Sequence, residues 1–189
     1  MMLVAPRPIT LPADYLEAEL TATEKHELHD GQVLAMSGGS ANHGIVCTTL
    51  IRQLQIQNEC LCLGSEIKVI VPLTGSYYYP DTTISCPPNF VDRKNGVIDN
   101  PTVIFEVLSP GTEAFDRGAK FRAYEQIETL REYVLISSDE PLIETFRRQP
   151  NNFWLRVIVE GLDATLELPS VEASIKLADL YEHVVFDAE

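Results

Sequence analysis

The feature that most constrains this chain is the segment TVIFEVLS, residues 102–109, an almost continuous apolar run with one charge, Glu106. Such a run is typical of a central strand buried on both faces. Alternation along the strand places Ile104, Glu106 and Leu108 on one face. A carboxylate in that setting is costly unless it is paired, hydrogen-bonded or bound to metal. We therefore expect Glu106 to have a specific partner.

The periodicity around this segment predicts an α/β (α+β) fold in which helices flank a mixed central sheet. Asp30-Gly31 predicts the turn of an N-terminal β-hairpin, since both positions favour positive φ. We expect a loose arm over 1–11 and a single domain over 12–189. The expected elements are helices at 13–20, 43–58, 115–127 and 176–185, strands at 62–72, 77–86, 102–109 and 131–137, and hairpins over 26–36 and 142–159.

Bulk composition is that of an ordinary globular protein of 189 residues, with 45% hydrophobic and 22% charged residues. No apolar run is long enough to span a bilayer, and the first residues do not have the pattern of a signal peptide. The cysteines Cys47, Cys60, Cys62 and Cys86 follow no zinc-site spacing. These features predict a cytoplasmic protein, with no membrane association, whose four thiols are buried and reduced.

The formal net charge of −14 weighs against nonspecific binding to a polyanion. Nucleic-acid affinity depends heavily on Lys and Arg neutralising phosphates. A nucleic-acid function therefore needs local clustering of cations, a divalent metal, or a second protein that supplies the basic surface.

Asp81 is a second carboxylate within a predicted strand, 77–86, directly after Pro80. Asp81 and Glu106, on neighbouring strands, can converge on one hard cation such as Mg²⁺, which prefers oxygen ligands. Such a cation can activate water and stabilise charge on a phosphoryl oxygen. The alternative is that each carboxylate caps a turn or pairs with a nearby arginine.

The order Pro80-Asp81, Glu106 and then a lysine resembles the PD-(D/E)xK nuclease superfamily. The fuller pattern is similar to the Uma-two family of restriction-endonuclease-like proteins, through HELHDGQVLAMSGGSANHG, YPDTTISC, PTVIFEVLSPGTEAFDRGAKFRAY and EYVLIS. The resemblance implies an αβββαβ core and hydrolysis of a phosphodiester. It also implies a Mg²⁺ or Mn²⁺ site at Asp81 and Glu106, helped by the backbone carbonyl of Val107.

One position departs from the superfamily pattern, which has its lysine two residues after the glutamate. This chain has Leu108 there. The nearest candidate is Lys120, which shares a predicted helix face with Asp116 and Tyr124, each four residues away. From that helix Lys120 could activate water or stabilise developing negative charge. The alternative is a surface ion pair between Lys120 and Asp116.

Several further residues are weaker candidates. His43, in the first turn of the helix 43–58, could position substrate or transfer a proton, or it could be a satisfied buried histidine. Glu27 matches an acidic residue of the family pattern, with a supporting or a purely structural role. Arg117 and Arg122 could face phosphates, although a solvated helix face explains them equally well.

These observations predict a metal-dependent endonuclease that hydrolyses nucleic acid, most simply DNA, and acts as a homodimer because two-fold symmetry suits cutting both strands. Asp81, Glu106, Lys120 and His43 are the expected catalytic residues. One alternative is a protein that keeps the fold for binding or assembly without catalysis. Another is a hydrolase of small phosphoesters, which would need a closed and narrow pocket.

Overall fold

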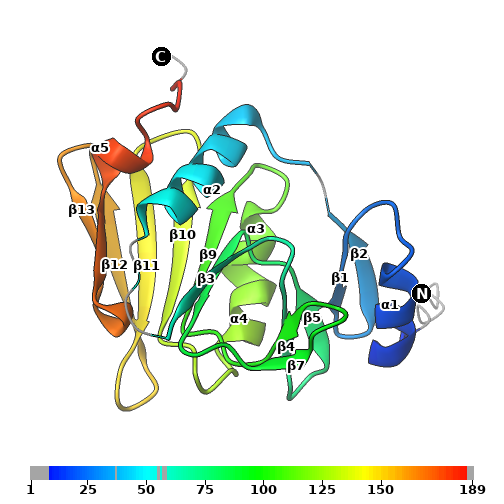
Figure 1. Cartoon of the computed structure of the whole chain (residues 1–189). Helices are drawn as coiled ribbons and strands as arrows, with labels where there is room; N and C mark the ends of the chain where they lie inside the picture. Colours follow the sequence, from blue (N-terminus) through cyan, green and yellow to red (C-terminus); the bar gives the residue numbers. More distant parts are fainter. Residues whose placement is uncertain (1–8, 37, 55, 57–58, 187–189) are drawn as a thin grey trace, which may run out of the picture.

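A mixed sheet runs through the middle of the molecule, with helices against both of its faces (Figure 1). The computed structural model describes residues 9–36, 38–54, 56 and 59–186. The strands of this central sheet lie in the order β12-β11-β10-β9-β6-β3. They are β3 (Leu61–Gly64), β6 (Thr82–Ser85), β9 (Val103–Leu108), β10 (Glu132–Ser137), β11 (Leu142–Arg148) and β12 (Trp154–Glu160).

Strand β9 occupies the interior of this sheet, and all of its residues are buried, as the apolar run predicted. It pairs antiparallel with β6 and parallel with β10, with Glu106 opposite Leu135. The parallel pairing requires a crossover, which the helical segment between the strands supplies. The order α2, β3, β6, β9, this helical segment and β10 is the predicted αβββαβ core.

The two faces of β9 pack into different cores, as alternation predicted. Val103, Phe105 and Val107 pack with α2 (Ala41–Gln53) and α5 (Leu177–Leu180). Ile104 and Leu108 pack with the opposite helical segment. That segment consists of α3 (Glu113–Phe115), the π-helical turn η1 (Asp116–Lys120) and α4 (Phe121–Tyr124). Across the described ranges, none of the helices is both long and apolar enough to cross a membrane.

A second sheet stands beside the central one, in the order β2-β1-β5-β4-β8-β7. Its strands are β1 (His26–His29), β2 (Gln32–Ala35), β4 (Lys68–Val71), β5 (Ser76–Tyr78), β7 (Phe90–Asp92) and β8 (Val97–Ile98). Asp30 and Gly31 turn the predicted hairpin β1-β2 with φ of 46° and 76°. The helix α1 (Pro12–Glu19) packs against this hairpin, close to its predicted range.

Two predicted strands are wrong in one respect, because each is divided between the two sheets. The segment 62–72 separates into β3 and β4 at a turn after Gly64, and 77–86 separates into β5 and β6. Pro80 has no N–H to continue a ladder, which favours a break there. Asp81 therefore lies just before β6, where the chain passes from one sheet to the other, and not inside a strand.

Other element predictions need smaller corrections. Helix α2 begins at Ala41 with the Ser40 hydroxyl accepting from the His43 N–H, and it ends at Gln53. Part of its predicted end, at 55 and 57–58, lies outside the described residues. The predicted hairpin 142–159 and short C-terminal helix are present as β11-β12 and α5. The hairpin formed by β13 (Thr165–Leu168) and β14 (Ala173–Lys176) was not predicted.

The prediction of four reduced thiols is wrong, because Cys60 and Cys86 form a disulfide. Leu61 of β3 pairs with Ser85 of β6, so the next residues along the antiparallel ladder face each other. Their Cα atoms are 4.0 Å apart. Cys47 and Cys62 remain free thiols.

The same substitution at two glycines should change the stability of the protein in opposite directions. Gly31→Ala places a Cβ at positive φ and 2.5 Å from Ile9 Cγ2, so we expect a loss of about 1–2 kcal/mol in the free energy of unfolding. Gly44→Ala, in α2 with open space around its Cβ, should gain roughly 0.5–1 kcal/mol. Urea unfolding of both variants checks this, and equal shifts would contradict the turn geometry.

Candidate active site

One cleft gathers most of the predicted site residues. Its volume is about 430 Å³. Residues of both sheets line it, including Glu106 and Val107 of β9, together with residues of the helical segment that follows β9. The ionisable side chains that line it are Glu27, His43, Asp81, Glu106, Asp116 and Lys120. The structure therefore brings into one place residues from β1, α2, the β5–β6 connection, β9 and η1.

The ammonium of Lys120 is the centre of this group. Its Nζ lies 2.9 Å from Glu106 Oε1, 3.0 Å from Glu27 Oε1 and 3.5 Å from Asp116 Oδ1. The Lys120 side chain is only 5% exposed. The surface ion pair with Asp116 alone is therefore not what the structure shows, because three buried carboxylates surround the amine.

The helical segment places Lys120 by presenting one side to Glu106. Asp116, Lys120 and Tyr124 all face inward, as their spacing predicted, although the turn from Asp116 to Lys120 is π-helical. The Tyr124 hydroxyl donates to Glu106 Oε1 at 3.2 Å. The Tyr133 hydroxyl donates to the Asp116 carbonyl at 3.0 Å, which ties the π-turn to β10. π-turns of this kind are frequent at functional sites.

The electrostatics of the cluster follow from burial and from the excess of carboxylates. Burial raises the pKa of Glu106 well above its ordinary value, against the opposing effect of Lys120. Burial likewise raises the pKa of Asp116. Burial alone would lower the pKa of Lys120, but Glu106, Glu27 and Asp116 outweigh it and raise that pKa. Lys120 is therefore an ammonium at neutral pH, suited to donate hydrogen bonds and to stabilise negative charge.

Asp81 is held on the other side of the cleft by a backbone donor and an imidazole. The Val107 N–H donates to Asp81 Oδ2 at 2.7 Å, and His43 Nε2 lies 3.3 Å from the same oxygen. The hydrogen bond to Asp81 raises the pKa of His43 against the opposing effect of burial, and the Val107 backbone contributes in the same direction. Val107 also lines the cleft.

The glycine loop before α2 fixes how His43 sits. A Cβ at Gly39 would lie 2.6 Å from His43 Nδ1 and 2.8 Å from Cγ, so the imidazole packs directly on the Gly39 backbone. A side chain at this position would push the ring out of place, because Cβ contacts under 3.0 Å are not tolerated. The glycine therefore lets His43 approach Asp81.

Glu27 links the N-terminal hairpin to the cluster. Its Oε1 accepts from the Tyr79 N–H at 3.0 Å and also contacts Lys120. Because Tyr79 immediately precedes Pro80 and Asp81, Glu27 connects the crossing between the sheets with the lysine.

The two arginines with a predicted phosphate contact lie elsewhere. Arg117 binds Glu113 through its Nε at 2.7 Å and also pairs with Glu144. Arg122 lies on α4, beyond Arg117, and does not line the cleft.

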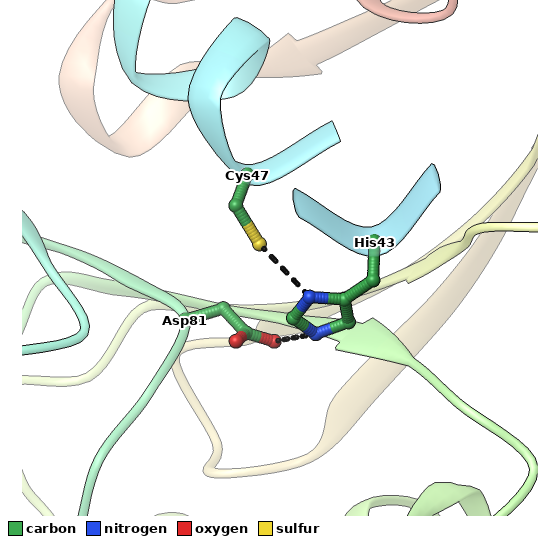
Figure 2. A group of neighbouring side chains, drawn as sticks. All are labelled: His43, Cys47 and Asp81. Carbon is green, nitrogen blue, oxygen red and sulfur yellow. Dashed lines mark hydrogen bonds and ion pairs between the residues drawn. The ribbon is translucent and has the colours of Figure 1, made fainter. Parts of the chain in front are cut away.

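Sequence reasoning did not place Cys47 beside His43 and Asp81. Its Sγ lies 3.6 Å from His43 Nδ1 (Figure 2), although the sequence predicted an ordinary buried thiol there. The available signal was the spacing, since residues four apart on a helix lie on the same face. What could not be read from the sequence is that Asp81 faces this pair.

Comparison with known proteins agrees with the predicted family. The Uma2 family, described as "Putative restriction endonuclease", matches residues 12–179. Two proteins of Synechocystis sp. (strain ATCC 27184 / PCC 6803 / Kazusa) are similar to this chain. "Uncharacterized protein slr1290" is 37% identical over 186 residues, 96% of each chain. "Uncharacterized protein sll1609" is 33% identical over 171 residues, 88% of this chain and 97% of that relative.

A solved structure agrees with the predicted fold. It is described as a "putative nuclease belonging to DUF820" from Anabaena variabilis ATCC 29413. Its TM-score is 0.71 at 17% identity, with 94% of this chain and 100% of that chain covered. At this identity the likeness shows that the two chains share a fold. Since the family match covers most of the chain and both relatives exceed 30% identity over most of it, this protein belongs to the Uma2 family of restriction-endonuclease-like proteins.

Proposed function

We propose that this protein is a metal-dependent endonuclease that hydrolyses phosphodiester bonds in DNA. The observation that carries the proposal is the position of Lys120, whose Nζ lies 2.9 Å from Glu106 Oε1 in the cleft that Asp81 also lines. In this proposal Lys120, from the next helical segment, takes the role of the lysine that the superfamily has on the strand. Membership of the Uma2 family supports a nuclease.

The donor set of the cleft fits Mg²⁺ or Mn²⁺. Asp81, Glu106 and the Val107 carbonyl are hard oxygen donors, which these ions prefer. Glu27 and Asp116 add two carboxylates, whereas Lys120 is the ammonium among them, so the cluster has negative charge that a dication would compensate. When bound, the ion supplies a more acidic water and stabilises charge on a phosphoryl oxygen.

The protein's own residues then divide the remaining tasks. Lys120 donates hydrogen bonds that orient the attacking water and stabilise the charge that develops on the phosphate oxygens. Glu27 and Asp116 hold the ammonium in place. His43, beside Asp81, provides a proton for the leaving oxygen as its bond to phosphorus breaks.

With a net charge of −14, association with DNA requires a divalent metal, locally clustered cations or a second protein that supplies a basic surface. Two copies acting together remain part of the proposal, because two-fold symmetry suits cutting of both strands.

Asp81→Ala and Glu106→Ala should each lower cleavage of plasmid DNA by at least about a hundredfold in Mg²⁺ or Mn²⁺, because each removes a carboxylate ligand of the ion. Glu128→Ala, at an exposed acid that does not line the cleft, is the matched control and should cleave as wild type does. Gel assays on plasmid and on single-stranded DNA measure the effect, with chelator as a second control.

The outcome separates the proposal from its rivals. Equal traces of cleavage in wild type and in both alanine variants would indicate a contaminating nuclease and contradict the enzyme. Binding of duplex DNA without cleavage would instead support a protein that keeps the fold for binding or assembly. Metal-dependent hydrolysis of small phosphoesters, with DNA left intact, would support the remaining rival.

Moving the lysine back to the strand tests the proposed role of Lys120. Lys120→Met should abolish cleavage and also lower stability, since loss of one member of a buried ionic cluster typically costs roughly 3–5 kcal/mol. Leu108 shares a strand face with Glu106. Leu108→Lys in the Lys120→Met background should therefore restore a measurable part of the cleavage rate.

Comparison of the variants distinguishes catalysis from folding. Melting midpoints show whether each variant is folded, and only folded variants enter the comparison. Lys94→Met, at an exposed lysine outside the cleft, controls for loss of positive charge. A folded Lys120→Met protein that cleaves at the wild-type rate would show that the lysine is only structural.

A further inference from the structure

The N-terminal half of helix α2 carries two possible metal-binding side chains, His43 and Cys47, that the proposed Mg²⁺ site does not use as ligands. They project from the same face of α2, four residues apart, toward Asp81, which lies just before β6 (Figure 2). The three residues offer an imidazole nitrogen, a sulfur and a carboxylate oxygen that all lie within 4.8 Å of one another.

Each pair of side chains, taken singly, has a separation close to that of two ligands of one ion. Cys47 Sγ lies 3.6 Å from His43 Nδ1, and His43 Nε2 lies 3.3 Å from Asp81 Oδ2. A tetrahedral zinc site has metal–ligand bonds of roughly 2.0–2.3 Å, which places its ligand atoms roughly 3.3–3.8 Å apart. These two contacts use opposite ring nitrogens of His43, whereas an ion binds only one of them. The His43 ring or the Asp81 carboxylate must therefore turn for the three donor atoms, which lie within 4.8 Å of one another, to face one point.

The donor types select the kind of metal. Mg²⁺ binds oxygen ligands and leaves thiolates and imidazoles unused. A set of one sulfur, one nitrogen and one oxygen suits Zn²⁺ and related ions such as Co²⁺. Three protein ligands leave a fourth position open, and His43 and Asp81 line the cleft from which an ion or water would arrive.

The surroundings of the triad favour a cation over an unpaired thiol. Cys47 is partly buried, and its sulfur lies within 4.8 Å of an Asp81 carboxylate oxygen. The negative charge of Asp81 is repulsive for an unligated thiolate and attractive for a dication. Cys62, the other free thiol, is also partly buried, but within the described part of the chain it belongs to no such group of three possible ligands.

We propose that His43, Cys47 and Asp81 form a binding site for a zinc-type divalent cation, separate in chemistry from the Mg²⁺ site but sharing Asp81 with it. Because one carboxylate serves both ligand sets, zinc bound here would exclude the hard cation. This consequence rests on the proposed function, whereas binding of the zinc-type ion does not.

Co²⁺ titration of the chelator-treated, desalted protein tests the site without nucleic acid or Mg²⁺. A thiolate bound to Co²⁺ gives charge-transfer absorption in the near ultraviolet, and Zn²⁺ should displace the ion and remove it. We expect saturation at one Co²⁺ per chain. Cys47→Ser should remove the absorption and weaken binding by more than roughly tenfold. Cys62→Ser, the matched control, should leave both unchanged.

Two further measurements locate the ligands and guard against misfolding. Asp81→Asn should weaken Co²⁺ binding by more than roughly tenfold while keeping the thiolate absorption at saturation. Zn²⁺ should slow alkylation of Cys47 but not of Cys62, read by mass spectrometry, and melting midpoints confirm folding of each variant. Absorption that survives Cys47→Ser, or no saturable absorption in folded wild type, would overturn the proposal. Loss of DNA cleavage in any variant has no bearing on it.

Discussion

The burial of one ammonium among three carboxylates is the interaction on which the arrangement of this cleft depends. Lys120 contacts Glu106 on the central strand, Glu27 on the N-terminal hairpin and Asp116 on its own helical segment. Removing one member of such a group from a dry interior leaves an uncompensated charge, which is strongly unfavourable. The cluster therefore fixes the hairpin, the sheet and the helical segment relative to one another, and in doing so it shapes the cleft.

The same cluster shows how an amine reaches Glu106 although the strand position two residues later is Leu108. Leu108 packs in the apolar core on the same strand face as Glu106. The amine that contacts Glu106 belongs instead to Lys120 of η1. Position in space and not in sequence decides which groups meet at a reacting atom. The turn Asp116–Lys120 in this segment is π-helical. The Tyr124 hydroxyl donates to Glu106, and the Tyr133 hydroxyl donates to the backbone carbonyl of Asp116, so both hydrogen bonds connect the helical segment to the sheet.

Asp81 is the other junction of the site, because it lies where the chain passes between the sheets. The Val107 N–H and His43 both bind its Oδ2, and Cys47 stands one helical turn beyond His43. Asp81 is therefore a ligand in both proposed sets, the oxygen ligands of the Mg²⁺ site and the nitrogen, sulfur and oxygen ligands of the zinc-type site. Two cations with different ligand preferences would compete for this residue, which connects the proposed catalytic metal with the proposed zinc-type site.

The amino-acid sequence by itself determined the elements whose signals are local. Periodicity and backbone preference account for the apolar run around Glu106, the Asp30-Gly31 turn and the inward face shared by Asp116, Lys120 and Tyr124. The resemblance supplied the family and the core order.

Only the tertiary structure decided what depends on contacts between distant segments. Those are the division of 62–72 and 77–86 between two sheets, the Cys60–Cys86 disulfide, the Glu27–Lys120 ion pair and the approach of Cys47 to Asp81. The physical reason is that alternation fixes which face a side chain takes, whereas its partner is fixed by which strands pair and where the chain crosses between sheets.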